Sequence, residues 1–209
     1  MASASEQLAQ NLNFGTFGKA KELQKRILFT IMVLVVYRIG TFIPVPGVDM
    51  AAYSQVFTTG GQGGGGGDLL TRMNMFSGGA VERMAIFALN VMPYITASII
   101  MTLMKGSIPS LVALDKDGEQ GRKQINQYTR YLTVLLASVQ AYGLAVGLEG
   151  MQSSSGSAVI DPGMFFRVST VVTIVGGTVF LMWLGEQITQ RGIGNGISLI
   201  IFAGIVAEL

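Results

Sequence analysis

The sequence predicts an all-α, polytopic membrane protein with five transmembrane helices. Half of its 209 residues are apolar, only 12% are charged, and the mean hydropathy is positive, which is too apolar for an ordinary soluble domain. A bilayer core of about 30 Å requires roughly 20 mostly apolar residues per helix, so the length of each apolar run is decisive. The five predicted transmembrane helices are residues 27–45, 83–105, 131–148, 164–184 and 197–209, and we expect the last one to be truncated.

The distribution of basic residues assigns the connecting segments to the two sides of the membrane. Lys and Arg concentrate in cytoplasmic segments of membrane proteins. If the N-terminal segment 1–26 is cytoplasmic, ten of the 14 Lys and Arg residues lie on that side and four on the other. We therefore predict a multi-pass protein with a cytoplasmic N-terminus, a cytoplasmic loop at 106–130 and a cytoplasmic turn at 185–196. Residues 46–82 and 149–163 are predicted to be external.

The chemistry available to the chain is narrow. It contains no cysteine and no histidine, which removes thiol nucleophiles, imidazole bases and the usual zinc and haem ligands. Residues 1–26 are polar and carry no signal-peptide cleavage site, so the first apolar run is expected to stay in the membrane. We predict a protein that is not an enzyme, with no catalytic residues, no cofactor, no metal and no nucleic-acid binding of its own.

The first external segment combines turn signals with a glycine tract. Pro44, Pro46 and Gly47 end the first helix at the outer interface, because each proline removes an amide donor. The glycine-rich tract at 60–67 predicts a flexible tether. A phosphate-binding loop is disfavoured, since no Gly-Lys-Ser/Thr sequence follows the tract and no strand precedes it.

A short helix is predicted after the tether. Asp68 is a good N-cap for a helix from Leu69 to about Met75, and the Ser-Gly-Gly sequence at 77–79 ends it. This helix is too short to cross a bilayer, and its apolar side chains must be buried somewhere. It either re-enters the protein or lies flat on the lipid surface, and the residue pattern leaves both alternatives open.

Polar side chains recur at every fourth position of the predicted second transmembrane helix. They are Asn90, Tyr94, Ser98 and Thr102. The neighbouring face carries Val91, Ile95 and Ile99. Such a stripe faces water or other helices, because facing lipid would leave polar groups unsatisfied. Hydrogen bonding between helices is the alternative to a water-filled passage. Pro93 within this helix indicates a bend or a functional break.

The other predicted spans carry fewer signals. Ser169, Thr173 and Gly177 form a small-residue seam that predicts close helix packing. We expect Arg38 to extend toward the outer surface, with a buried pair as the alternative. No Asp, Glu or Lys lies near the middle of a span, which argues against a proton- or ion-coupled carrier. The glycine-rich turn at 192–196 follows a helix and not a strand, so it does not indicate a dinucleotide site.

Five longer motifs carry a resemblance to a known family. They are RIGTFIPVPG at 38–47, NMFSGGA at 74–80, MPYI at 92–95, GRKQINQYTRY at 121–131 and MWLGEQITQRGIGNGIS at 182–198. Together they closely resemble the bacterial SecY (SecY/Sec61-alpha) family of preprotein translocase subunits, from about residue 19 to the C-terminus. The resemblance implies a ten-helix channel in two pseudo-symmetric halves, located in the bacterial plasma (inner) membrane. This chain corresponds to the N-terminal half.

The resemblance also assigns roles to particular positions. A plug that closes the outer funnel would comprise Leu69, Leu70, Met73, Asn74, Met75, Phe76, Ser77, Gly78 and Gly79, which favours a re-entrant helix. The pore ring would include Val91, Ile95 and Ile201, and the lateral gate Thr96 and Gln140. Val91 is smaller than the isoleucine usual in the family, and Asn90 replaces a frequent glycine, so we predict a slightly leakier ring. The glycine tract before the plug is unusual for the family.

The function implied is passage of unfolded preproteins across the membrane, with release of hydrophobic segments into the bilayer through the lateral gate. The implied partners are the membrane subunits SecE and SecG, the SecA motor or a translating ribosome on the cytoplasmic side, YidC, preproteins with their signal sequences, and membrane lipids. Two alternatives remain open. One is a small-solute secondary carrier built on a broken helix around Pro93, and the other is a non-functional fragment.

Overall fold

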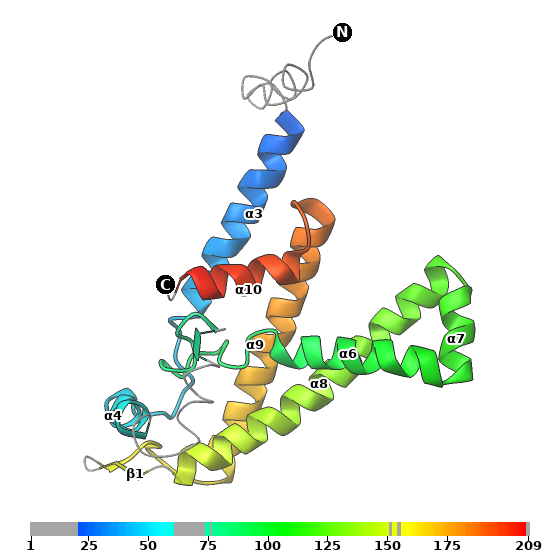
Figure 1. Ribbon diagram of the computed structural model, residues 1–209. Coiled ribbons are helices and arrows are strands. Elements are labelled where there is room, and N and C mark those ends of the chain that lie inside the picture. Colours follow the sequence, from blue (N-terminus) through cyan, green and yellow to red (C-terminus); the bar gives the residue numbers. More distant parts are fainter. Residues whose placement is uncertain (1–20, 61–73, 76, 151, 154–155, 208–209) are drawn as a thin grey trace.

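Helices make up most of the described part of the chain (Figure 1). The computed structural model describes residues 21–60, 74–75, 77–150, 152–153 and 156–207. In chain order its elements are α3 (Lys21–Gly40), α4 (Met50–Gly60), α6 (Met92–Ser107), α7 (Pro109–Lys116), α8 (Glu119–Gly150), β1 (Gln152–Ser153), β2 (Gly156–Ser157), α9 (Met164–Arg191) and α10 (Gly196–Val206). The two strands form one antiparallel hairpin. The prediction of an all-α fold is confirmed apart from this hairpin.

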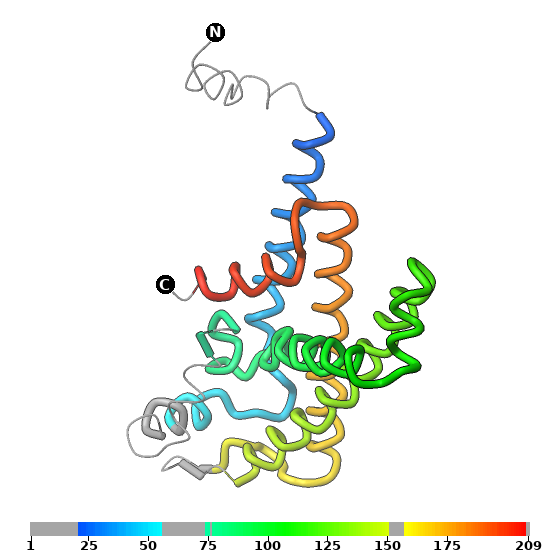
Figure 2. The backbone as a smooth tube through the Cα atoms, turned by 45° about the vertical axis from the view of Figure 1, so that its right-hand side comes forward, coloured from blue at the N-terminus to red at the C-terminus, as the bar shows by residue number. Residues whose placement is uncertain are grey.

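The helices are arranged around a packed pair formed by α8 and α9. Helices α6 and α7 pack on α8, while α3 and α10 pack on α9. Figures 1 and 2 both show α3 running alongside α9, and α10 crossing from the end of α9 toward α3. Small side chains at every fourth position of α8 face the interior, and they are Thr129, Thr133, Ala137, Ala141 and Ala145. Such a stripe lets neighbouring helices approach closely.

Two helices of the described residues are long and apolar enough to cross a membrane, namely α8 and α9. Helices α6 and α7 meet the same condition only when taken together as one bent pair, with 98° between them. Helix α10 is apolar but short, and α3 carries Lys25, Arg26 and Arg38 along its length. Two or three spans are therefore found, and the crossing of the membrane by five helices stays a prediction.

The first helix ends earlier than the apolar run at 27–45 predicted. Helix α3 stops at Gly40, where the Thr41 hydroxyl donates a hydrogen bond to the Arg38 carbonyl at 2.7 Å. Pro44 disfavours helical backbone at the residue before it. The chain continues through turns with a bridge between Pro44 and Ala85, and the Val45 amide donates to the Met84 carbonyl at 2.9 Å. Residues 43–45, at the end of the predicted span, therefore form backbone hydrogen bonds with residues 84–86.

The second helix begins later than predicted. Residues 80–91 form consecutive turns, and α6 starts at Met92. Met84 and Asn90 have positive φ values of 41° and 49°, which interrupt a right-handed helix. Pro93 consequently lies in the first turn of α6, where a missing amide donor costs nothing, and not in mid-span. The bend occurs instead at Pro109, the first residue of α7.

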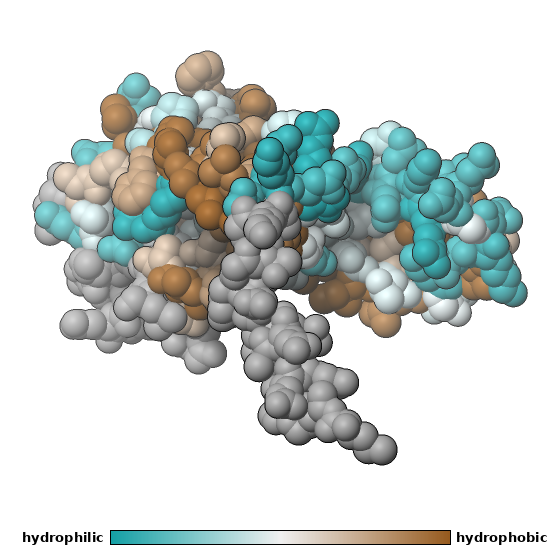
Figure 3. All heavy atoms as spheres, turned by 90° about the horizontal axis from the view of Figure 1, so that it is seen from above, coloured by the Kyte–Doolittle hydropathy of each residue, from teal (hydrophilic) through white to brown (hydrophobic). Residues whose placement is uncertain are grey.

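The segments predicted as cytoplasmic loop 106–130 and turn 185–196 are largely helical. The loop contains α7 and the first turns of α8, and α9 continues to Arg191. These extensions are polar. Figure 3 views the molecule from the end at which α3 begins, and it shows hydrophilic side chains gathered over the α7 side. Apolar periodicity marks the portion of a helix that can lie in lipid, so polar turns at its ends escape that signal.

Candidate functional site

The three predicted pore residues belong to one hydrophobic cluster, called here the central cluster. Its buried members are Val33, Tyr37, Ala80, Ala85, Phe87, Val91, Leu181, Leu184, Ile188 and Ile200. Ile95 and Ile201 pack against it and are partly buried. Val91, the N-cap of α6, is only 1% exposed. The fold therefore brings together residues of α6 and α10 that are far apart in the sequence.

Next to this cluster lies the closing turn, defined as residues 77–79. Gly78 and Gly79 have φ values of +64° and +77°, which glycine adopts without strain. The Arg38 guanidinium donates a hydrogen bond from one terminal nitrogen to the Gly78 carbonyl at 2.9 Å. The Tyr37 hydroxyl donates to the Ser77 carbonyl at 3.4 Å. Arg38 is thus partly buried and bonds to the backbone of the closing turn, and within the described residues it does not form the buried ion pair that was the alternative.

The residues on either side of the closing turn are tied to each other. The Asn74 side-chain oxygen accepts from the Glu82 amide at 2.9 Å, and its amide nitrogen donates to a Glu82 carboxylate oxygen at 3.2 Å. The Ser77 hydroxyl donates to the Asn74 carbonyl at 3.0 Å. Asn74 and Ser77 are both buried. The loop from 74 to 82 is therefore closed by its own hydrogen bonds.

Only part of the predicted plug falls within the described residues. Asn74, Met75, Ser77, Gly78 and Gly79 are described, and Met75 is exposed. The remaining predicted plug residues, Leu69, Leu70, Met73 and Phe76, lie outside the described residues, as do the glycine tract from residue 61 onward and Asp68. The choice between a re-entrant and an interfacial helix therefore stays open for them.

A second anchor fixes α4 beside the closing turn. The Tyr53 hydroxyl of α4 donates to the Val81 carbonyl at 2.9 Å. Burial raises the pKa of Tyr53 to about 12, with a further contribution from the nearby Glu82 carboxylate. The hydroxyl therefore stays protonated, and remains a donor, throughout the physiological pH range.

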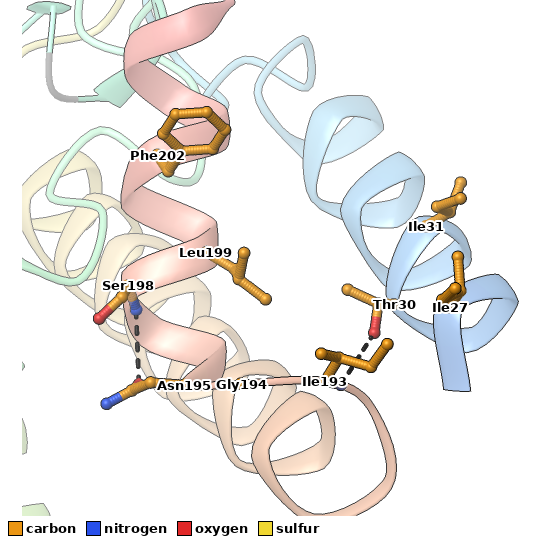
Figure 4. A pocket seen from close by; sticks show the side chains of 9 residues that line it. All are labelled: Ile27, Thr30, Ile31, Ile193, Gly194, Asn195, Ser198, Leu199 and Phe202. Carbon is orange, nitrogen blue, oxygen red and sulfur yellow. Dashed lines mark hydrogen bonds between the residues drawn. The ribbon is translucent and has the colours of Figure 1, made fainter. Parts of the chain in front are cut away.

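The position of α10, and with it Ile201, is set by the turn at 192–195. Asn195 caps α10 by accepting a hydrogen bond from the Ile197 amide at 3.1 Å. The Ile193 amide donates to the Thr30 hydroxyl of α3 at 3.3 Å. Between α3 and α10 lies an apolar groove of about 480 Å³, with Ile31 and Phe202 on its two sides (Figure 4). The turn predicted at 192–196 is thus the joint between α9 and α10.

The predicted lateral-gate residues lie on two helices that pack together. Thr96 is exposed on α6 and donates to the Met92 carbonyl at 3.1 Å, while Gln140 is exposed on α8. Within the polar stripe, the Thr102 hydroxyl donates to the Ser98 carbonyl of α6 at 2.8 Å. The Thr96 and Thr102 hydroxyls thus donate to carbonyls of their own helix and not to another helix.

The sequence reasoning missed two ion pairs that join α8 to α9. Arg130 binds both carboxylate oxygens of Glu186, at 2.9 and 2.6 Å, and Arg167 binds Glu149 at 2.6 Å. Glu149 also accepts a hydrogen bond from the Gly163 amide at 3.1 Å. Pairs so distant in the sequence leave no local signal. The one available hint was that Arg130 and Glu186 both lie within motifs quoted above.

The polar groups of the site hold a loop in place beside the central cluster. Within the described ranges, no group of three or more His, Cys, Asp and Glu side chains could hold a metal ion. The contacts that Tyr37, Arg38 and Tyr53 make at and beside the closing turn end on backbone carbonyls. Such contacts position a segment against an apolar cluster. The fold and site together define a helical membrane protein whose apolar centre is covered by an internally bonded loop.

The chain belongs to the SecY family. The SecY family model matches residues 85–209, which is more than half of the chain. This confirms the resemblance inferred from the five motifs. The matched region contains the three predicted pore residues and both predicted gate residues.

Individual relatives agree with this assignment. The protein translocase subunit SecY of Rickettsia felis is 56% identical over 186 residues, covering 89% of this chain and 42% of the relative. The same subunit of Escherichia coli K12 is 53% identical over 192 residues, again covering 42% of the relative. The chain thus spans less than half the length of these relatives. A solved structure of SecY is similar to this chain, with a TM-score of 0.59 and 25% identity. The similarity covers 88% of this chain and 36% of that chain, and the structure is described as one in which the plug domain stabilises the closed state.

Proposed function

We propose that this chain forms the N-terminal half of a protein-conducting channel. It would pass unfolded preproteins across the membrane and release hydrophobic segments into the bilayer. The observation that carries the proposal is the convergence of Val91, Ile95 and Ile201 in one apolar cluster beneath the closing turn. The names of the relatives, which are protein translocase subunits, support the same assignment.

The apolar character of the proposed ring suits a sliding polypeptide. Branched aliphatic side chains offer an unfolded chain no strong hydrogen-bonding site at which to stall. A hydrophobic constriction also excludes water and ions when it is closed. The burial of Val91 and its contact with the central cluster are consistent with a closed passage.

The proposed lateral gate would use α6 and α8, which carry Thr96 and Gln140. A gap between helices lets a signal sequence choose between the channel and the lipid by its transfer free energy. Each Leu-type residue contributes about 0.3 to 0.6 kcal/mol to that choice. The gate would therefore sort clients by hydrophobicity.

The proposed location and partners follow from the family. The N-terminus would be cytoplasmic in a bacterial inner membrane, which places the basic ends of α7 and α8 on the cytoplasmic side. Lys116, Arg122 and Lys123 are exposed there, where a SecA motor or a ribosome would dock. SecE, SecG and YidC would be the membrane partners, and the second half of the channel would complete the ring.

Co-purification tests this function. The chain, produced with its complementary half and SecE, should be isolated with SecE and with a preprotein stalled by a folded C-terminal domain. A preprotein that lacks its signal sequence is the control and should not be retained. Counterflow of a small solute across vesicles, without retention of either SecE or the preprotein, would replace the channel by a carrier.

A further inference from the structure

A second groove lies between α8 and α9, near the end at which the hairpin joins these helices (Figure 1). It has a volume of about 330 Å³, and α9 lines it with Met164, Val168, Val171 and Val172. Helix α8 contributes Ser138 and Tyr142, and Arg167 of α9 adds a positive charge. We call it the outer groove, because this end of the two helices is predicted to be external.

The outer groove opens on a surface that faces lipid. Helices α8 and α9 are the two described helices that are long and apolar enough to cross a membrane, and most of the apolar stretch of each is turned outward. Met164, Val168 and Val172 are 79%, 52% and 66% exposed. Water is a poor occupant of a groove with apolar walls, whereas an acyl chain supplies the dispersion contacts that an empty groove lacks.

Arg167 lies at the outer end of this apolar surface and is held in a fixed orientation. Its Nε and one terminal nitrogen donate to the same carboxylate oxygen of Glu149, at 2.9 and 2.6 Å. The other carboxylate oxygen accepts from the Gly163 amide at 3.1 Å. Two of the five N–H donors of Arg167 are thus used by Glu149. The Arg167 side chain is still 37% exposed, so the guanidinium remains accessible to a ligand.

The groove and Arg167 together match the polarity of a phospholipid. Arginine binds phosphate through several N–H donors at once, and its long side chain reaches the headgroup level from within the first turn of a helix. From Met164 to Val172, α9 rises by about 12 Å. One leaflet of the hydrocarbon core is about 15 Å thick, half of the bilayer core. A phosphate at Arg167 would therefore place an acyl chain along the apolar wall of the groove.

We propose that the outer groove binds one phospholipid of the outer leaflet, with its phosphate at Arg167 and one acyl chain along Val168, Val171 and Val172. Because Glu149 neutralises Arg167, the recognised group is the phosphate diester and not the net charge of the headgroup. Zwitterionic phosphatidylethanolamine and anionic phosphatidylglycerol should therefore bind with similar affinity. The site uses none of the proposed pore or gate residues, and it goes beyond the proposed channel function.

Arg130 provides a matched control for the charge. It forms the other ion pair between α8 and α9, with the same shortest distance of 2.6 Å to Glu186, and it is 47% exposed. It does not line the outer groove. Arg130→Gln therefore removes an equivalent cation from an equivalent pair on the same two helices.

Val179 provides a matched control for the groove. Val168→Trp places a large side chain where the acyl chain would lie, and Val168 is exposed enough to accept it without repacking the interior. Val179 is exposed on the same helix, about three turns further along, and does not line the groove. Val179→Trp thus adds the same bulk to the same helix outside the proposed site.

Native mass spectrometry tests the proposal by counting bound lipids. The complete channel, with its complementary half and SecE, is stripped of lipid in detergent and titrated with dioleoyl phosphatidylethanolamine or dioleoyl phosphatidylglycerol. We expect Arg167→Gln to weaken one binding event by about tenfold or more for both lipids, given the strength of a charged hydrogen bond. Val168→Trp should abolish the same event, and Arg130→Gln and Val179→Trp should bind as the wild type does. Circular dichroism verifies that each variant is folded.

Val168→Trp keeps the proposal testable if Arg167→Gln does not fold, because it leaves the ion pair with Glu149 intact. Unchanged lipid binding in Val168→Trp, or an equal loss in either control, overturns the proposal. A loss confined to phosphatidylglycerol would show recognition of net charge and overturn it as well. If Val168→Trp releases a membrane subunit and not a lipid, the groove binds a protein helix instead. No preprotein is present in this assay, so each of these outcomes leaves the proposed channel function untouched.

Discussion

Gly177 of α9 is the position at which one added methyl group should disturb the proposed pore most directly. It is buried, and a Cβ there would collide with the Ile86 carbonyl and stand 3.2 Å from the Phe87 ring. A backbone carbonyl cannot rotate aside as a side chain can. In Gly177→Ala, the segment 84–91 must therefore shift, and it carries Val91.

Gly176, the adjacent residue, provides the reference for the change in free energy of unfolding. Nothing lies within 4 Å of a Cβ at Gly176, which is exposed on the same helix. Overpacking a close contact costs about 1–3 kcal/mol. Gly→Ala at an open helix position stabilises by up to about 1 kcal/mol. Because the helix-propensity gain applies to both positions and cancels, the free energies of unfolding of Gly177→Ala and Gly176→Ala should differ by the overpacking cost of about 1–3 kcal/mol.

The assay is unfolding in detergent micelles by increasing dodecyl sulfate, followed by circular dichroism. Gly177→Ala should unfold at lower dodecyl sulfate than the wild type, and Gly176→Ala at equal or higher concentration. If both variants have the same free energy of unfolding, the close contact of α9 with residues 86–87 is wrong. The account of how Val91 is positioned would then fail as well.

Three further predictions concern the ring, the ion pairs and pH. Val91→Ile should lower the resting ion conductance of the complete channel, and an undiminished current would reject the idea of a leakier ring. Glu186→Gln should cost less than about 1 kcal/mol in free energy of unfolding, because Arg130 and Glu186 are 47% and 27% exposed. Glu149→Gln should lower the free energy of unfolding more than Glu186→Gln does, since Glu149 is 11% exposed and also accepts a hydrogen bond from the Gly163 amide. A larger loss in Glu186→Gln would contradict this. Burial holds the folded pKa of Tyr53 at about 12, above its ordinary value, so its contribution to stability is complete below about pH 10 and declines as the pH rises through 12. Tyr53→Phe should show a smaller alkaline decline than the wild type in a pH series of unfolding curves.

Long apolar runs predicted the helices that pack as a pair. The run at 164–184 lies within α9, which begins at the same residue, and the run at 131–148 lies within α8. These helices were predictable because apolar residues continued for the full length that a bilayer requires. Their polar extensions were not predictable from apolar periodicity, because they are stabilised by helix pairing and not by burial in lipid.

The start of α6 could not be predicted from the local sequence. Residues 83–91 are apolar enough for a helix, yet Val45 pairs with Met84 and Met84 adopts a positive φ. That conformation depends on a contact between segments that are distant along the chain. The prediction that Pro93 bends a helix in mid-span was wrong, because the turns that precede it place Pro93 in the first turn of α6.

The candidate site was predicted by family resemblance and not by composition. No periodicity links Ile95 of α6 with Ile201 of α10, and the fold alone brings both to the central cluster. For Arg38, in contrast, the sequence did not predict the contact that the structure shows. Its position near a helix end suggested solvent, whereas a glycine turn far along the chain supplies its hydrogen-bond acceptor.

The central claim is that a polypeptide in transit passes the face of α6 that carries Ile95. The most direct measurement is disulfide formation between Ile95→Cys and a single cysteine in a stalled preprotein, with Met104→Cys, exposed on the opposite face of α6, as the control. We predict a crosslink at residue 95 that requires the signal sequence, and little at residue 104. Absence of any crosslink at 95 while the preprotein is demonstrably held would contradict the proposed path.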